Sequence, residues 1–234
     1  MSHFLRLELT RYQRTAIYVA ATATIALLAA LYFFATIGRF DDSPGSAMFR
    51  QYNAVFSLAL TVALCVIAIY GSIIYARFIV TDYIGNRRIQ LYSYPGGRHQ
   101  LFLAKNTAFT LTIASASAIG LLLAVAIFFL SETITPIVNS AEGISWVHVL
   151  ASSASVVILA VSVTLIAGTI GIWRQSVIAT IVSAIVAITV LGNGVALSLN
   201  GAAWLTWIIN AAGVVAALIL LMGQARKIRA DEVL

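Results

Sequence analysis

The stretch of this sequence best equipped to bind a partner is residues 77–105, RFIVTDYIGNRRIQLYSYPGGRHQLFLAK. It contains five of the fourteen Lys and Arg residues: Arg77, Arg87, Arg88, Arg98 and Lys105. Apolar runs long enough to cross a bilayer lie on both sides of it. Because Lys and Arg are retained on the cytoplasmic side during membrane insertion, we predict that residues 77–105 form a cytoplasmic surface that meets a cytosolic partner.

Residue types that carry out catalysis or metal binding are not arranged for either task. The three histidines, His3, His99 and His148, fall in separate segments without an HExxH pair, and the single cysteine, Cys65, lies inside an apolar run. The sequence also lacks a GxSxG nucleophile motif and the phosphate-binding motif GxxxxGKS or GxxxxGKT. We therefore predict that this chain is not an enzyme and has no metal site. Any ATP hydrolysis linked to it would take place in another chain.

The composition is that of a membrane protein. Apolar residues make up 61% of the chain and charged residues 9%, with a mean hydropathy of +0.99, whereas soluble domains are about a quarter charged. A transmembrane helix needs roughly 20 apolar residues, and the polar breaks leave room for about six such helices. The net charge of +6 does not indicate nucleic-acid binding, because the basic residues fall in short segments between apolar runs.

We predict an all-α polytopic membrane protein in which residues 1–234 form one transmembrane domain. The six predicted transmembrane helices cover about 16–37, 52–75, 107–130, 147–172, 177–197 and 204–222. The third and fourth of these are rich in Gly, Ala and Ser, which let helices approach closely in lipid. We expect the third to pack centrally.

Residues 1–14, which precede the first apolar run, mix apolar with charged side chains. We predict that they form an amphipathic elbow helix lying flat at the membrane interface, with apolar side chains toward lipid and arginines toward headgroups. The predicted interfacial residues are Arg6, Glu8, Arg11, Tyr12 and Arg14. The apolar run that follows is longer than a signal-peptide core, so we expect it to remain as the first transmembrane helix.

Basic residues are distributed unevenly between the predicted loops. Twelve of the fourteen Lys and Arg residues fall in segments that this arrangement places inside, and only Arg39 and Arg50 fall outside. The positive-inside rule therefore predicts that both termini are cytoplasmic. Charged residues are scarce within the predicted helices, which argues against an ion-coupled pump. For Asn193 and Asn210, the main polar exceptions, we favour hydrogen bonds between helices over contact with a substrate.

The centre of residues 77–105 predicts a short helix held off the membrane. Gly85 and Asn86 favour a helix end, because Gly and Asn readily adopt the left-handed conformation. Residues 87–94 mix basic, polar and apolar side chains, and Pro95 with the two glycines after it stops any helix there. Such an amphipathic segment is suited to lipid headgroups or to a groove in a partner protein, and the pattern alone does not decide between them.

This loop resembles the inner loop of the permease subunits of type 2 ATP-binding-cassette (ABC) exporters. The resemblance is closest to the branch associated with export of, or immunity to, bacitracin, lantibiotics and other antimicrobial peptides. The shared pattern is an acidic-Tyr pair, a basic pair, an aromatic-Ser-Tyr-Pro run, an Arg and a Lys. In this sequence these positions are Asp82-Tyr83, Arg87-Arg88, Leu91-Tyr92-Ser93-Tyr94-Pro95, Arg98 and Lys105. Residues 8–12, ELTRY, also resemble the elbow helix of that family, whereas Gly96-Gly97 replaces its aliphatic-polar pair.

The resemblance implies the permease subunit of an ATP-driven exporter that moves hydrophobic or amphipathic peptides, drugs or antibiotics out through a bacterial plasma membrane. It implies a dimer with a second identical or related permease, and a cytosolic ABC ATPase subunit that carries ATP and Mg, so this chain needs no cofactor. The implied ATPase-coupling residues are Asp82, Tyr83, Arg87, Arg88, Ile89, Leu91, Tyr92, Tyr94, Pro95 and Arg98. A membrane scaffold or sensor that binds a cytosolic regulator through residues 77–105 stays open as a different class of function. The sequence identifies neither the substrate nor its path.

Overall fold

The computed structural model describes residues 2–40, 49–84, 98–134, 137–138, 145–193 and 203–230. Its main elements are α1 (Ser2–Phe40), α2 (Tyr52–Phe78), the short 3-10 helix η2 (Val80–Tyr83), α4 (Arg98–Ile134), α5 (Trp146–Trp173), α6 (Val177–Leu191) and α8 (Ala203–Ala230). Within the described residues all regular secondary structure is helical, which confirms the predicted all-α class. Long apolar segments become helices because lipid offers no partners for backbone N–H and C=O groups.

Five of these helices, α1, α2, α4, α5 and α8, are long and apolar enough to cross a membrane, which indicates a multi-pass membrane protein. They contain the predicted transmembrane segments 16–37, 52–75, 107–130, 147–172 and 204–222. The remaining predicted segment, 177–197, begins with α6, which is 15 residues long. At 1.5 Å per residue α6 spans about 22 Å, less than the roughly 30 Å of a hydrocarbon core. The sixth transmembrane helix therefore stays a prediction.

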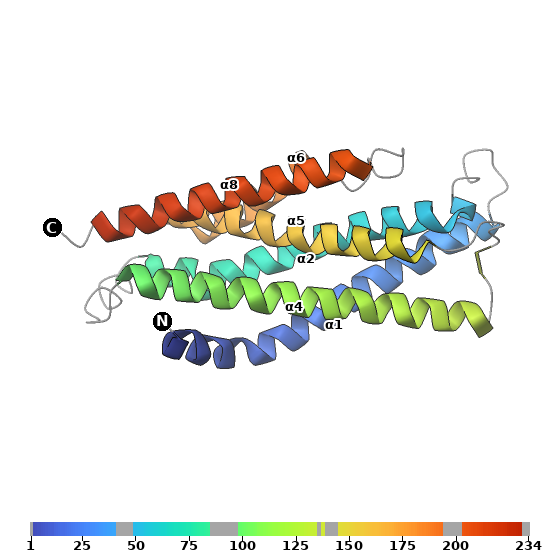
Figure 1. Cartoon of the computed structure of the whole chain (residues 1–234), viewed down its shortest axis with the longest axis horizontal. Helices are drawn as coiled ribbons and strands as arrows, with labels where there is room; N and C mark the ends of the chain where they lie inside the picture. Colours follow the sequence, from blue (N-terminus) through green and yellow to red (C-terminus); the bar gives the residue numbers. More distant parts are fainter. Residues whose placement is uncertain are drawn as a thin grey trace.

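The helices form an up-and-down bundle (Figure 1). Apart from η2, each helix runs antiparallel to the one before it when α6 is counted, so α5 and α8 run in the same direction. The start of α1, the end of α8 and the ends of α2 and α4 that flank residues 85–97 all lie at one end of the bundle, which we call the loop end. At the centre, α5 packs against α2, α4, α6 and α8. Of the five long helices, α2 and α5 are the most buried, whereas α4 packs mainly along α1. The expectation that residues 107–130 occupy the centre is therefore wrong.

Glycines mark two places where neighbouring helices pack closely. A Cβ atom at Gly168 of α5 would lie 2.1 Å from Cε1 of Tyr75 in α2. A Cβ atom at Gly120 of α4 would lie 2.4 Å from the backbone oxygen of Ala20 in α1. Both distances are far below van der Waals contact, so only glycine fits. Close packing through small residues, predicted for the third and fourth segments, is confirmed at these contacts.

A tight turn joins α5 to α6, as the short polar break in the sequence predicts. The amide of Ser176 donates to the carbonyl of Gly171 at 3.0 Å and that of Gln175 to Ile172 at 3.2 Å, which are the two bonds of a Schellman motif. Gln175 has a φ of 49°, in the left-handed region that glycine usually occupies. The Ser176 hydroxyl then accepts from the amide of Ala179 at 3.3 Å and caps α6.

The predicted elbow, residues 1–14, differs from the expectation of a short separate helix. Within residues 2–40 no break divides it from the first transmembrane segment, and both belong to α1. Figure 1 shows the N-terminal turns of α1, in dark blue, bent away from the direction of the rest of the helix. The interfacial role of this segment stays a prediction.

The second long helix ends earlier than Gly85 and Asn86 predict. After α2 the chain forms η2 and then takes an extended conformation at Ile84, with φ −110° and ψ 135°. Ile79, Val80 and Tyr83 are all buried in this stretch. Packing of these apolar side chains against the bundle therefore ends the helix, rather than the local preference of the glycine and asparagine.

Candidate functional site

The two helix ends that flank the predicted coupling segment are joined by an ion pair. Nζ of Lys105, in α4, lies 2.5 Å from Oδ2 of Asp82, in η2. The side chains of Lys105 and Asp82 are 5% and 18% exposed, so water reaches the carboxylate more readily than the ammonium group. The pair therefore fixes the distance between η2 and α4, the elements that precede and follow residues 85–97.

A second contact joins the same two elements. The rings of Tyr83, in η2, and Phe102, in α4, meet edge to face with their centroids 5.5 Å apart, and both side chains are buried. Such aromatic pairs stabilise a fold by about 0.5–1.5 kcal/mol beyond the burial of their area. An electrostatic and an apolar contact together fasten η2 to α4.

Tyr75 links this region to the centre of the bundle. Its hydroxyl donates to Oδ1 of Asn106 at 2.6 Å, and Nδ2 of Asn106 donates to the carbonyl of Phe102 at 2.8 Å. The Tyr75 ring meets the ring of Phe109 edge to face at 5.0 Å and lies against the backbone of Gly168. Buried hydrogen bonds with both partners present favour one arrangement of the helices, so α2, α4 and α5 are held in register here.

Tyr12 of α1 belongs to the same buried cluster. It is 1% exposed and meets the rings of Phe78 and Phe109 edge to face, at 5.5 and 6.1 Å. The prediction that Tyr12 faces the membrane interface is wrong. Burying its ring between α2 and α4 removes more apolar area from solvent than an interfacial position would.

Among the predicted elbow residues whose side chains the structure describes, Glu8, Arg11 and Arg14 are less buried than Tyr12. Arg11 and Arg14 are exposed, and the guanidinium of Arg11 lies 5.5 Å from the ring centroid of Phe78 and 4.0 Å from the carboxylate of Glu8. Arg6 belongs to α1, but its side chain lies outside the described part of the structure. The arrangement of Arg11 and Arg14 suits contact with headgroups, a role that stays a prediction.

Most of the predicted ATPase-coupling residues lie outside the described residues: Arg87, Arg88, Ile89, Leu91, Tyr92, Tyr94 and Pro95. Arg98 begins α4, and its side chain is likewise not described. Asp82 and Tyr83 are the two predicted coupling residues whose side chains the structure places, and it brings both against α4 at the loop end. Sequence reasoning missed Tyr75 and Asn106. The one feature of the sequence that could have pointed to them is that each places a polar group in an apolar run next to the basic loop.

A further residue that sequence reasoning missed lies at the opposite end of the bundle. The carboxylate of Glu132 is buried and accepts hydrogen bonds from the amides of Ile137 at 3.1 Å and Val138 at 3.4 Å and from the hydroxyl of Tyr52 at 3.2 Å. Three donors satisfy the buried carboxylate. Glu132 thus fixes the backbone that follows α4, and a lone acidic residue at the end of an apolar run could not have revealed these partners.

The two asparagines predicted to bond between helices behave differently. Nδ2 of Asn210, in α8, donates to the hydroxyl of Ser155, in α5, at 2.6 Å, which confirms the prediction for Asn210. Asn193, which follows the end of α6, is exposed, and its Nδ2 donates to the carbonyl of Thr189 in α6, four residues earlier, so the structure gives no support there for a bond between transmembrane helices.

Taken together, the contacts at the loop end suit mechanical linkage. Among the described residues no group of three or more His, Cys, Asp or Glu side chains is placed to hold a metal ion. The ion pair, the Tyr75 hydrogen bond and the aromatic contacts join α1, α2, η2, α4 and α5. Rigid elements that are joined in this way can transmit a displacement from one end of a bundle to its centre.

Comparison of this chain with models of known protein families, with characterised proteins and with solved structures found no match. Its function is therefore argued from the sequence pattern and from the geometry of the loop end.

Proposed function

We propose that this chain is the transmembrane permease subunit of an ATP-driven exporter of the type 2 ABC family. In this proposal two permease copies form the path, and a cytosolic ATPase subunit binds residues 77–105 of each. Movement of the ATPases on binding and hydrolysing ATP tilts the transmembrane helices and releases a hydrophobic or amphipathic substrate outside. The membrane helix bundle and the resemblance of the loop support this proposal.

The observation that carries the proposal is the Asp82–Lys105 ion pair at the base of the loop. A coupling segment must deliver force to the bundle instead of moving freely on its own. The ion pair and the Tyr83–Phe102 contact tie both flanking ends together, so a load on residues 85–97 reaches α2 and α4 at once. From there the contact of Tyr75 with Gly168 leads to the central helix α5. A segment that only rested on headgroups would need none of these connections.

The proposal includes six transmembrane helices with both termini in the cytoplasm. The start of α1 and the end of α8 lie at the same end of the bundle, which is consistent with an even number of crossings (Figure 1). α6 runs back from the tight turn after α5 and supplies about 22 Å of the fifth crossing. The twelve inner Lys and Arg residues favour the loop end on the cytoplasmic side.

Reporter fusions test this topology. A reporter active only in the cytoplasm should be active when fused at Leu234 and inactive when inserted within residues 134–144. A reporter active only outside should give the reverse pattern. Activity of the same reporter at both positions would exclude the six-helix arrangement.

The partner is tested by replacing Leu91 and Tyr92 together with Asp. Charges on the apolar side of a small interface cost several kcal/mol when buried without partners, so the ATPase should no longer co-purify and export should be lost. The amount of permease in the membrane should stay normal. The matched control is Gln175→Asp, which adds a charge to an exposed turn near the loop end and should leave both readouts unchanged.

The outcomes separate the two classes of function. If the double variant still captures the ATPase and exports normally, the loop only anchors the protein to lipid headgroups. Capture of a cytosolic protein without ATPase activity would favour a scaffold or sensor. The purified permease alone should hydrolyse no ATP, since its sequence has no phosphate-binding loop, and clear turnover would contradict the proposal.

A further inference from the structure

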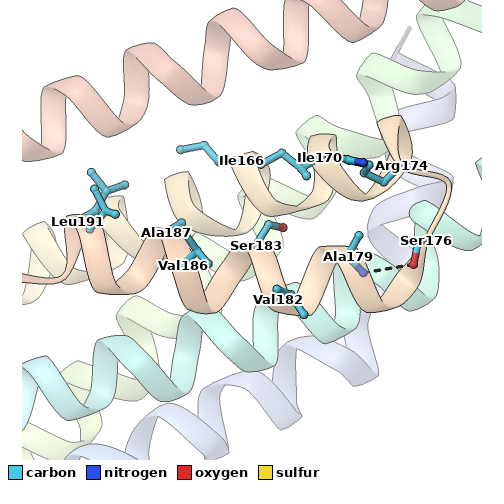
Figure 2. Close-up of a pocket in the computed structure, with 11 residues that line it drawn as sticks. Ile166, Ile170, Arg174, Ser176, Ala179, Val182, Ser183, Val186, Ala187 and Leu191 are labelled. Atoms are coloured by element: carbon cyan, nitrogen blue, oxygen red, sulfur yellow. Dashed lines mark hydrogen bonds between the residues drawn. The ribbon is translucent and has the colours of Figure 1, made fainter.

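An open groove of about 730 Å³ runs along α5 and α6 (Figure 2). Its volume falls within the range of about 300–1,000 Å³ that is typical of small-molecule sites. Most of the side chains that line it are aliphatic, among them Ile166, Ile170, Val182, Val186, Ala187 and Leu191. An apolar surface of this shape suits a hydrocarbon chain.

Arg174 gives one end of the groove a positive charge. It is the one charged residue among those that line the groove, and it lies beside the α5–α6 turn next to Ser176 (Figure 2). Its guanidinium is exposed and lies 5.5 Å from the ring centroid of Trp173. No carboxylate in the described part of the chain forms an ion pair with it. The groove therefore combines a long apolar wall with a single cation at its mouth.

We propose that this groove binds an anionic phospholipid, with one acyl chain along α6 and the phosphate at Arg174. The lining follows α6 from the turn at Arg174 to Leu191, about 22 Å at 1.5 Å per residue, which exceeds the roughly 15 Å depth of one leaflet. A lipid anchored at Arg174 thus has its chain against protein over the full leaflet. Trp173, which is exposed beside Arg174, is a side chain that favours the headgroup level.

Charge favours a lipid over a second copy of this chain as the occupant. Twelve of the fourteen Lys and Arg residues belong to the segments assigned to the loop side, and the net charge of the chain is +6. A second copy seated in the groove in the same membrane orientation would bring further basic side chains near Arg174, and like charges at an interface are unfavourable. An anionic headgroup neutralises Arg174 instead. This proposal does not depend on the presence of an ATPase partner.

Native mass spectrometry of the delipidated full chain in detergent tests the site, with equal amounts of phosphatidylglycerol and phosphatidylcholine as probes. The wild-type chain should retain one phosphatidylglycerol in preference to phosphatidylcholine. Arg174→Gln should lower this preference about five-fold, the value expected for one Arg at a lipid surface. Ala187→Phe should fill the groove and reduce binding of both lipids, while Arg174 remains in place.

Arg226→Gln is the matched control, because Arg226 is an exposed arginine of α8 that does not line the groove. It should leave the preference unchanged. If Arg226→Gln lowers the preference for phosphatidylglycerol as much as Arg174→Gln does, diffuse charge attracts the lipid and the site proposal is wrong. If Arg174→Gln leaves the preference unchanged, Arg174 does not bind the headgroup and the proposal is likewise wrong. If Ala187→Phe separates a dimer into monomers and leaves lipid binding intact, a second copy occupies the groove and the proposal is wrong. Size-exclusion profiles establish that each variant is folded.

Discussion

Neutralising Asp82 probes the ion pair that ties the two ends of the loop together. Asp82→Asn keeps the size of the side chain and removes only its charge. Lys105, whose side chain is 5% exposed, would then keep a buried ammonium group without its carboxylate partner. The change therefore isolates the electrostatic contribution of the pair to the stability of the bundle.

The structure predicts an asymmetry between the two partners. Removing one member of a buried ion pair costs about 3–5 kcal/mol, which for a chain of this size corresponds to a fall of roughly 6–20 °C in Tm. Lys105→Gln should cost less, because the Asp82 side chain is 18% exposed and water can solvate its carboxylate. The double variant leaves no uncompensated charge and should recover part of the loss of Asp82→Asn.

The measurement is thermal unfolding of each purified variant in one detergent, followed by intrinsic fluorescence. Arg226→Gln provides the control, because Arg226 is exposed and changes at exposed side chains usually alter stability by no more than about 0.5 kcal/mol. The reasoning is refuted if Asp82→Asn lowers Tm no more than Arg226→Gln. Strict additivity of the two single changes in the double variant would also show that Asp82 and Lys105 do not interact.

Two further predictions concern contacts of the bundle away from this ion pair. Gly168→Ala places a Cβ 2.1 Å from the buried ring of Tyr75 and should lower Tm by about 2–12 °C, as expected for overpacking of about 1–3 kcal/mol. Gly223→Ala is the control and should leave Tm unchanged, because nothing lies within 4 Å of its Cβ. Equal shifts of Tm in the two variants would contradict the close contact between Gly168 and Tyr75. Glu132→Ala leaves the amides of Ile137 and Val138 without their acceptor and leaves the Tyr52 hydroxyl only the Val138 carbonyl, at 3.5 Å, so it should cost about 1–3 kcal/mol. Glu132→Gln, which keeps one oxygen, should cost less. The same midpoint for both Glu132 variants would show that the carboxylate does not hold this backbone.

The sequence alone was sufficient to predict the helical class and five of the long helices. Apolar runs of this length must satisfy their backbone groups internally in lipid, which leaves few alternatives to a helix. The turn between Trp173 and Val177 was equally predictable, because only three residues separate two apolar runs. Composition and spacing therefore located the apolar cores of these five helices, whereas the sixth predicted segment, 177–197, stays a prediction.

The partners at the candidate site were decided by tertiary structure. The resemblance singled out Asp82 and Lys105, but nothing in their spacing showed that they touch. The burial of Tyr12, the contact of Tyr75 with Gly168 and the hydrogen bonds of Glu132 were not predicted at all. Side chains with polar groups found their partners across helices that are far apart in the sequence.

The physical reason lies in the solvent of these helices. In water, the apolar stripe of a helix shows which face packs inward. In lipid, the faces toward the bundle and toward the bilayer are both apolar, so the periodicity of the sequence carries little information about rotation. Packing between α2, α4 and α5 sets that rotation, and with it the groups that meet at Asp82, Tyr75 and Gly168.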